Sequence, residues 1–157
     1  MIPELIDIGG PWKVLPPGVH IITIKELEKF YITNSNRGHL FIGFNKAVTA
    51  LFKAGGKTIF LDGSFVTSKP TPNDYDVCWD IDGVDENKLD PVFFDFSNKR
   101  KEQKRKYYGE FFPINFLATD EIFFYDFFQI DKHTGKAKGI IRINLKEIKK
   151  VEGVILW

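Results

Sequence analysis

Residues 58–76 read TIFLDGSFVTSKPTPNDYD and decide the fold that the sequence predicts. The run from Thr58 to Leu61 is short, continuous and apolar, which is typical of a buried strand. Gly63-Ser64 follows it directly, and a glycine there lets the backbone turn sharply and lets a ligand approach closely. Nine residues separate Ser64 from Asp74, where a second strand should begin. The segment therefore predicts two strands joined by a long turn.

Asp74 and Asp76 give this segment its chemistry. Side chains alternate along a strand, so the two carboxylates should share one face. Two like charges at such a short distance repel each other unless a cation lies between them. Hard oxygen ligands favour Mg²⁺ or Mn²⁺. Amides freed at the Gly63-Ser64 turn, with the Ser64 hydroxyl, can hold phosphate oxygens. Phosphate beside metal is the layout for nucleotidyl transfer. The alternative is a strand cap, with Asp74 solvated and Asp76 in a salt bridge.

The segment resembles the signature of the DNA-polymerase-β-type nucleotidyltransferase superfamily, in which Gly-Ser precedes an Asp-x-Asp pair. The matching residues are Gly63, Ser64, Asp74 and Asp76. The resemblance implies a small mixed β-sheet flanked by helices and a third carboxylate on a later strand. It also implies transfer of a nucleoside monophosphate from an NTP to an acceptor hydroxyl of a protein, a tRNA or a small molecule.

A narrower resemblance spans nearly the whole chain. Residues 15–18, 61–67, 126–129 and 134–140 look like a small, uncharacterised bacterial and phage family of such proteins. Analogy with small stand-alone members of the superfamily suggests a toxin–antitoxin or phage-defence setting. It also suggests a partner protein that supplies or serves as the acceptor.

The third carboxylate is expected on the strand after the next helix. Glu110 is first on that strand and is our first choice, although the superfamily more often has Asp there. Asp126 is the alternative, because an Asp within an aromatic run is costly to bury without a partner. It would be either a metal ligand or a structural Asp bonded to a cation or to amides. Lys69 lies between Ser64 and the Asp pair and could reach a triphosphate, unless it is simply solvated.

A basic stretch follows, with six cations in the eight residues 99–106. Such a stretch is usually a solvated helix face, but beside a nucleotidyltransferase centre it could also follow a nucleic-acid backbone. The residues concerned are Lys99, Arg100, Lys101, Lys104, Arg105 and Lys106.

The order of predicted elements makes the chain α+β. We expect an extended arm over residues 1–22 and one domain over 23–157. Thr23 and Glu26 form a capping-box signal for the first helix. The other expected elements are helices at 38–54 and 86–108, strands at 58–61, 75–81, 110–117, 122–130 and 139–145, and a short helix and a final strand within 146–157.

Composition sets the outer limits. A length of 157 residues suits one domain, and 16 Phe predict a Phe-rich core. The net charge of +1 neither favours nor excludes nucleic acid, and the single cysteine, Cys78, excludes an internal disulfide. We find no signal peptide and no membrane-spanning run, so we expect a cytoplasmic protein without a membrane partner. Two other functions stay open: an inactive nucleotide-binding or protein-interaction module on the same fold, and a plain structural module.

Overall fold

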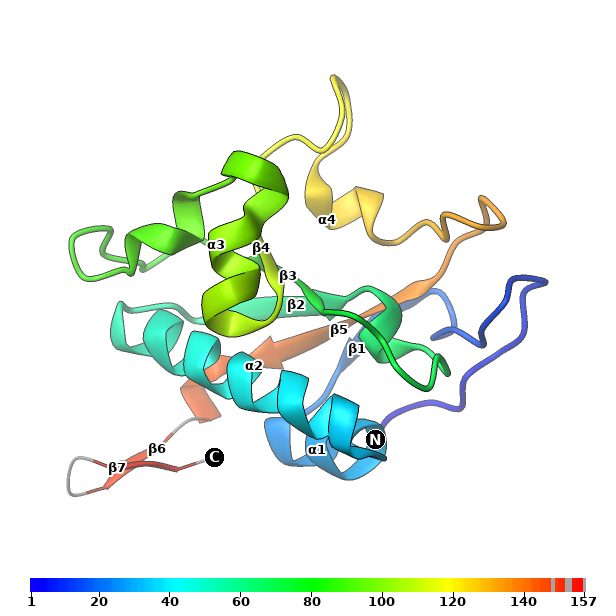
Figure 1. Cartoon of the computed structure of the whole chain (residues 1–157), viewed down its shortest axis with the longest axis horizontal. Coiled ribbons are helices and arrows are strands. Elements are labelled where there is room, and N and C mark those ends of the chain that lie inside the picture. Colours follow the sequence, from blue (N-terminus) through cyan, green and yellow to red (C-terminus); the bar gives the residue numbers. More distant parts are fainter. Residues whose placement is uncertain (148, 152–153, 157) are drawn as a thin grey trace.

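A five-stranded mixed sheet forms the centre of the molecule (Figure 1). The computed structural model describes residues 1–147, 149–151 and 154–156, and the side chains of residues 1–146. The strand order is β1-β5-β2-β3-β4, with β2 antiparallel to both neighbours and the two outer pairs parallel. The prediction of a mixed sheet flanked by helices is confirmed. The strands are β1 (Gly18–Ile21), β2 (Thr58–Asp62), β3 (Asp76–Trp79), β4 (Glu110–Pro113) and β5 (Gly139–Asn144).

Two helices, α1 (Ile24–Tyr31) and α2 (Ser35–Lys53), cover one face of the sheet. Alternate strand residues point into this larger core, and among them are Ile59, Leu61, Val77 and Phe111. The expected capping box is present, with Thr23 Oγ1 accepting from the Glu26 amide at 3.1 Å and Glu26 Oε2 accepting from the Thr23 amide at 2.8 Å. Helix α2 begins at Ser35, before the expected Gly38, because the Asn34 side chain caps it.

A smaller aromatic cluster covers the opposite face. Phe60, Cys78, Phe112 and Ile140 form its floor, and helix α4 (Phe124–Phe127) lies on them (Figure 1). The expected strand at 122–130 is therefore wrong. Phe124 stacks on Phe112 with ring centroids 4.1 Å apart, and Phe128, one helical turn later, contacts the same ring. One helical turn brings both rings inward, and β5 pairs with β1 and β2 instead of with this segment.

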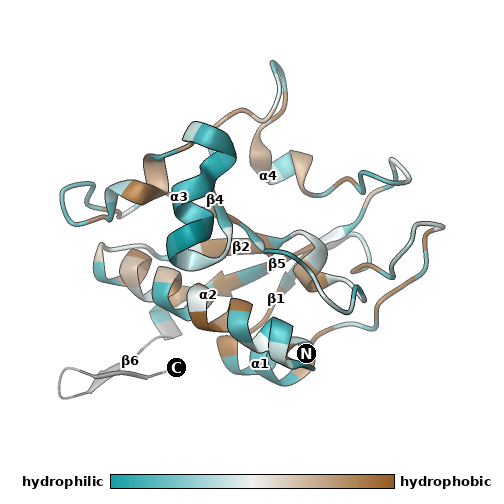
Figure 2. Ribbon diagram, in the orientation of Figure 1, coloured by the Kyte–Doolittle hydropathy of each residue, from teal (hydrophilic) through white to brown (hydrophobic). Residues whose placement is uncertain are grey.

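The expected helix at 86–108 consists of two shorter pieces. A 3₁₀ turn, η2 (Pro91–Phe94), is capped by the Asp90 side chain, and α3 (Ser97–Tyr107) follows. Proline has no amide hydrogen, so a helix cannot run into Pro91 from before it. Figure 2 shows α3 as hydrophilic along its length. Strand β4 is shorter than the predicted 110–117 and ends at Pro113, because proline has no amide hydrogen to donate to a neighbouring strand.

The N-terminal segment is more than an arm. Its last residues form β1, which pairs in parallel with β5 from Gly18↔Gly139 to Ile21↔Arg142. The sheet thus begins before the expected domain boundary at residue 23. The C-terminal region has a 3₁₀ turn, η3 (Leu145–Glu147), and a separate hairpin of β6 (Lys149–Val151) and β7 (Val154–Leu156), two strands where one was expected. None of the helices in the described ranges is long and apolar enough to cross a membrane.

Candidate metal centre

Three adjacent strands place three carboxylates in a row. Asp62 on β2 is the register partner of Asp76 on β3, and Asp76 is the register partner of Glu110 on β4. Directly opposed residues of paired strands point to the same face of the sheet. Phe60, Cys78 and Phe112 point to this same face, because each lies two residues from one of these acids on its own strand. The acids therefore lie beside the cluster that α4 covers.

Asp74 joins this row from outside the sheet. Strand β3 begins at Asp76, so Asp74 is not the strand residue that the alternation argument assumed. Its carboxylate nevertheless lies with the others: one oxygen from each of Asp74, Asp76 and Glu110 is within 4.8 Å of the other two. We call these three residues the acidic trio. Asp126 lies exposed on α4 and outside the trio, because α4 directs Phe124 inward and Asp126 outward.

The Gly63 turn is in contact with the trio. Gly63 has φ +85, and a Cβ built on it would lie 2.3 Å from Asp76 Oδ2. Only glycine therefore satisfies both the backbone conformation and the close approach of the carboxylate. Ser64 starts the 3₁₀ turn η1 (Ser64–Val66), in which the Val66 and Thr67 amides bond to Gly63 O and Ser64 O. Asp76 thus opens towards the predicted phosphate-binding turn.

Arg37, on α2, holds the loop after Ser64 and is a residue that sequence reasoning missed. Its side chain is buried, and Nη1 donates to Phe65 O at 2.6 Å while Nη2 donates to Thr67 O at 3.0 Å and Lys69 O at 2.6 Å. A signal was present. Arg37 stands four residues before Phe41 and so continues the apolar stripe of α2, where a charged residue indicates buried partners.

Cations surround the trio. Arg100 Nε lies 3.0 Å and Lys104 Nζ lies 3.1 Å from the same oxygen, Glu110 Oε1. Burial raises the pKa of Asp74, as does the charge of Glu110, while Lys104, Lys69 and Lys132 oppose this rise. Lys69 therefore lies close enough to Asp74 for its charge to act on that carboxylate.

The protonation of the trio is uneven. Burial, the contact with Glu110 and the charge of Asp74 raise the pKa of Asp76 well above its usual range. Burial would also raise the pKa of Glu110, but its contact with Asp76 and the nearby cations Lys104 and Arg100 outweigh burial and lower that pKa. Without a divalent cation, Asp76 is therefore the more easily protonated carboxylate of the pair.

Asp62 is a second residue that sequence reasoning missed. It is 1% exposed, and within the part of the chain that the structure describes neither carboxylate oxygen has a hydrogen-bond partner. Burial raises its pKa to about 6, against the charge of Lys138, whose Nζ lies 3.5 Å away. Its own charge contributes to the raised pKa of Asp76, so it acts on the trio from the neighbouring strand β2. An Asp that ends an apolar run before a glycine is the sequence signal.

The residues of this centre fit a hard divalent cation. All the candidate ligands are carboxylate oxygens, which Mg²⁺ and Mn²⁺ prefer. The buried Asp62 carboxylate next to them, which has no hydrogen-bond partner among the described residues beyond its 3.5 Å ion pair with Lys138, adds negative charge that a cation would offset.

A model described as a family of unknown function, DUF6932, matches residues 11–144. This chain belongs to the DUF6932 family. No curated protein and no solved structure matches the chain. The DUF6932 match includes the acidic trio, Gly63, Arg37, Asp62 and the basic stretch, so the whole centre lies in the region that defines the family.

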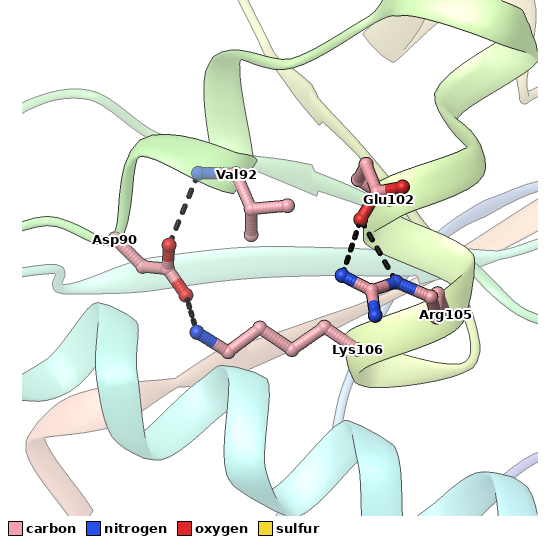
Figure 3. A pocket seen from close by; sticks show the side chains of 5 residues that line it. All are labelled: Asp90, Val92, Glu102, Arg105 and Lys106. Atoms are coloured by element: carbon pink, nitrogen blue, oxygen red, sulfur yellow. Dashed lines mark hydrogen bonds and ion pairs between the residues drawn. The ribbon is translucent and has the colours of Figure 1, made fainter.

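Two further cations of the basic stretch in this DUF6932 chain, Arg105 and Lys106, form local ion pairs. A hollow of about 290 Å³ lies between η2 and α3, and Figure 3 shows the side chains that line it. Its cations are already paired with its acids, Lys106 with Asp90 and Arg105 with Glu102. Lys99 and Lys101 are exposed and form no ion pair with the described residues. Cys78 is a core residue, as expected, and burial raises the pKa of its thiol well above the usual range.

Proposed function

We propose that this chain is a metal-dependent nucleotidyltransferase, which moves a nucleoside monophosphate from an NTP to an acceptor hydroxyl. The observation that carries the proposal is the convergence of Asp74, Asp76 and Glu110 within 4.8 Å of one another. They converge against a glycine turn whose Cβ position is filled by Asp76 Oδ2. The mixed sheet, with this turn between β2 and β3, supports a nucleotidyltransferase-like fold.

Each residue has a role in this proposal. Asp74 and Asp76 would hold the Mg²⁺ or Mn²⁺ that the triphosphate contacts, and Asp76 with Glu110 would hold a second ion near the acceptor. Such ions neutralise phosphate charge and lower the pKa of a bound hydroxyl. Gly63 and Ser64 would hold the phosphates, with Lys69 adding positive charge. Arg37 keeps the loop in place, so catalysis rests on positioning and electrostatics without a covalent intermediate.

A second function is favoured by one specific observation. Glu110, the third ligand, already accepts from Arg100 and Lys104. If those ion pairs persist in the presence of divalent cations, the chain would be an inactive nucleotide-binding or protein-interaction module on the same fold. The acceptor and the toxin–antitoxin or phage-defence setting remain proposals that rest on analogy.

The test is incubation of the purified chain with each α-³²P-labelled NTP, Mg²⁺ or Mn²⁺, and a cell extract. We expect the label to enter an acceptor with the parent chain and with Asp126→Asn, but not with Asp76→Asn. Cation-dependent NTP binding without label transfer would favour the inactive module. Absence of cation-dependent NTP binding would contradict both functions.

A further inference from the structure

Two cations converge on one oxygen of the trio. Arg100 Nε and Lys104 Nζ both lie within 3.1 Å of Glu110 Oε1. The Glu110 side chain is only 14% exposed, so water screens these contacts weakly. A planar guanidinium and an ammonium group around one anionic oxygen resemble the donor arrangement that proteins use to hold a phosphate group.

Arg100 is held there against its local backbone preference. Asn98, Lys99 and Arg100 are consecutive non-glycine residues with φ of 50, 56 and 62, all in the left-handed region. Each such residue costs about 1–2 kcal/mol relative to a right-handed turn. The guanidinium carbon lies 5.0 Å from the Phe112 ring centroid, over the floor of the cluster. Contacts with Phe112 and Glu110 therefore hold Arg100 in an otherwise unfavourable turn.

Glu110 cannot fully serve these cations and a divalent ion at once. A divalent ion held by the trio draws on the carboxylate charge and is repelled by Arg100 and Lys104 at short range. The Asp62 carboxylate, buried beside Asp76, has no hydrogen-bond partner among the described residues, and its ion pair with Lys138 is 3.5 Å long, which independently indicates that the centre is short of positive charge.

We propose that Arg100 and Lys104 form a phosphate-binding site, which the Glu110 carboxylate occupies as an internal anion until a divalent cation takes up Glu110. The inference rests on the proposed function, because it needs the trio to bind a divalent cation. The ligand class is a phosphate group carried by a substrate. Cation and phosphate then bind cooperatively, since each favours release of the Glu110 ion pairs, and this coupling is reciprocal.

The test compares two double variants of equal charge. Arg100→Gln with Lys104→Gln removes the proposed site, and Lys99→Gln with Lys101→Gln removes two exposed cations of the same helix that touch no trio carboxylate. Mn²⁺ affinity is measured by calorimetry without phosphate. Inorganic phosphate affinity is measured by ³¹P NMR with and without saturating Mg²⁺. Thermal melting checks that both variants fold.

We expect the Arg100/Lys104 variant to bind Mn²⁺ about tenfold more tightly or better, because the repelling charges are gone. It should also lose the increase in phosphate affinity that saturating Mg²⁺ gives the parent chain. The Lys99/Lys101 variant should match the parent within about twofold in both measurements.

The outcomes separate the two proposals. If the parent chain binds Mn²⁺ but the Arg100/Lys104 variant binds it no more tightly, the inference is wrong and the metal centre stands. Phosphate binding by the parent that does not depend on Mg²⁺ would also overturn the inference. If the parent chain binds no Mn²⁺ at all, the proposed function itself fails.

Discussion

At the residue scale, the centre depends on the fit between one glycine and one carboxylate. Gly63 combines a left-handed φ of +85 with a 2.3 Å approach of Asp76 Oδ2 to its Cβ position. Gly135 offers a matched comparison, because it has φ +71 and a Cβ there would meet no atom of the described chain within 4 Å. The two glycines separate the cost of conformation from the cost of the contact.

Gly63→Ala should lower the free energy of unfolding by roughly 2–4 kcal/mol, from backbone strain plus displacement of Asp76. Gly135→Ala should cost about 1 kcal/mol, from conformation alone. Urea denaturation measures both. Mn²⁺ binding should be lost only in Gly63→Ala. Equal destabilisation of the two variants would mean that the contact with Asp76 carries no energy.

The raised pKa of Asp76 predicts an unusual pH dependence in the cation-free chain. A carboxyl group whose folded pKa lies above its ordinary value of 3.8 contributes stability that is present below that value and is lost as pH rises towards the folded pKa. Asp74 and Asp62 act in the same direction. Glu110, whose pKa is lowered, acts oppositely, but only around and below its ordinary value of 4.5.

Urea denaturation in EDTA should therefore show stability falling as pH rises from about 5 to 7. Asp76→Asn should reduce this slope and be at least as stable as the parent chain at pH 7, because the repulsion is gone. It should also lose the stabilisation that Mg²⁺ with NTP gives the parent. A parent chain that gains stability over this pH range would contradict the raised pKa of Asp76. A variant that Mg²⁺ with NTP still stabilises equally would place the ligand site elsewhere.

At the element scale, the sequence predicted the parts governed by local patterns. The capping box at Thr23, the apolar run of β2 and the position of Glu110 at the start of β4 all follow from short-range rules, and the structure confirms them. The error at 122–130 has a physical cause, because a run in which nearly every residue is aromatic or apolar has neither a clear period of two nor one of 3.6. The left-handed turn at Asn98 to Arg100 is set by tertiary contacts, so no local signal predicts it.

Helix α4 can be tested by comparing neighbours. In a strand, Tyr125 and Phe127 would share one face and be buried alike. In α4, the Tyr125 ring packs on Phe60 at 4.9 Å, while Phe127 is 44% exposed. Tyr125→Ala should therefore cost about 2–3 kcal/mol and Phe127→Ala less than about 1 kcal/mol in thermal or urea unfolding. Equal costs would favour the strand.

Arg37 links α2 to the loop that we propose binds phosphate. Arg37→Met keeps much of the side-chain volume but leaves the carbonyls of Phe65, Thr67 and Lys69 without these donors. We expect a loss of about 3 kcal/mol or more in unfolding free energy. The Thr67 amide should also exchange faster with solvent. Arg105→Met, which breaks an exposed pair with Glu102, is the control and should cost less than about 1 kcal/mol. An equally small loss for Arg37→Met would show that the loop holds itself.

At the scale of the whole molecule, the two faces of the sheet differ in what they carry. The face under α1 and α2 holds the larger core. The other face has a small aromatic cluster, and beside it the carboxylates of β2, β3 and β4 meet the cations of α3. Sequence spacing predicted the Asp pair, and the resemblance to nucleotidyltransferases predicted a third carboxylate with Glu110 as first choice, whereas the roles of Asp62 and Arg37 became clear only in the assembled sheet and helix layer.

The central claim is that the trio supports transfer of a nucleoside monophosphate. The most direct measurement compares the same NTP labelled at the α or the γ phosphate, with Mg²⁺ and the acceptor fraction of a cell extract. We predict that the α-label becomes attached to the acceptor and that the γ-label is released in pyrophosphate. Asp76→Asn should abolish both the transfer and the release. Transfer of γ-label to the acceptor, or α-label transfer that persists in Asp76→Asn, would contradict it.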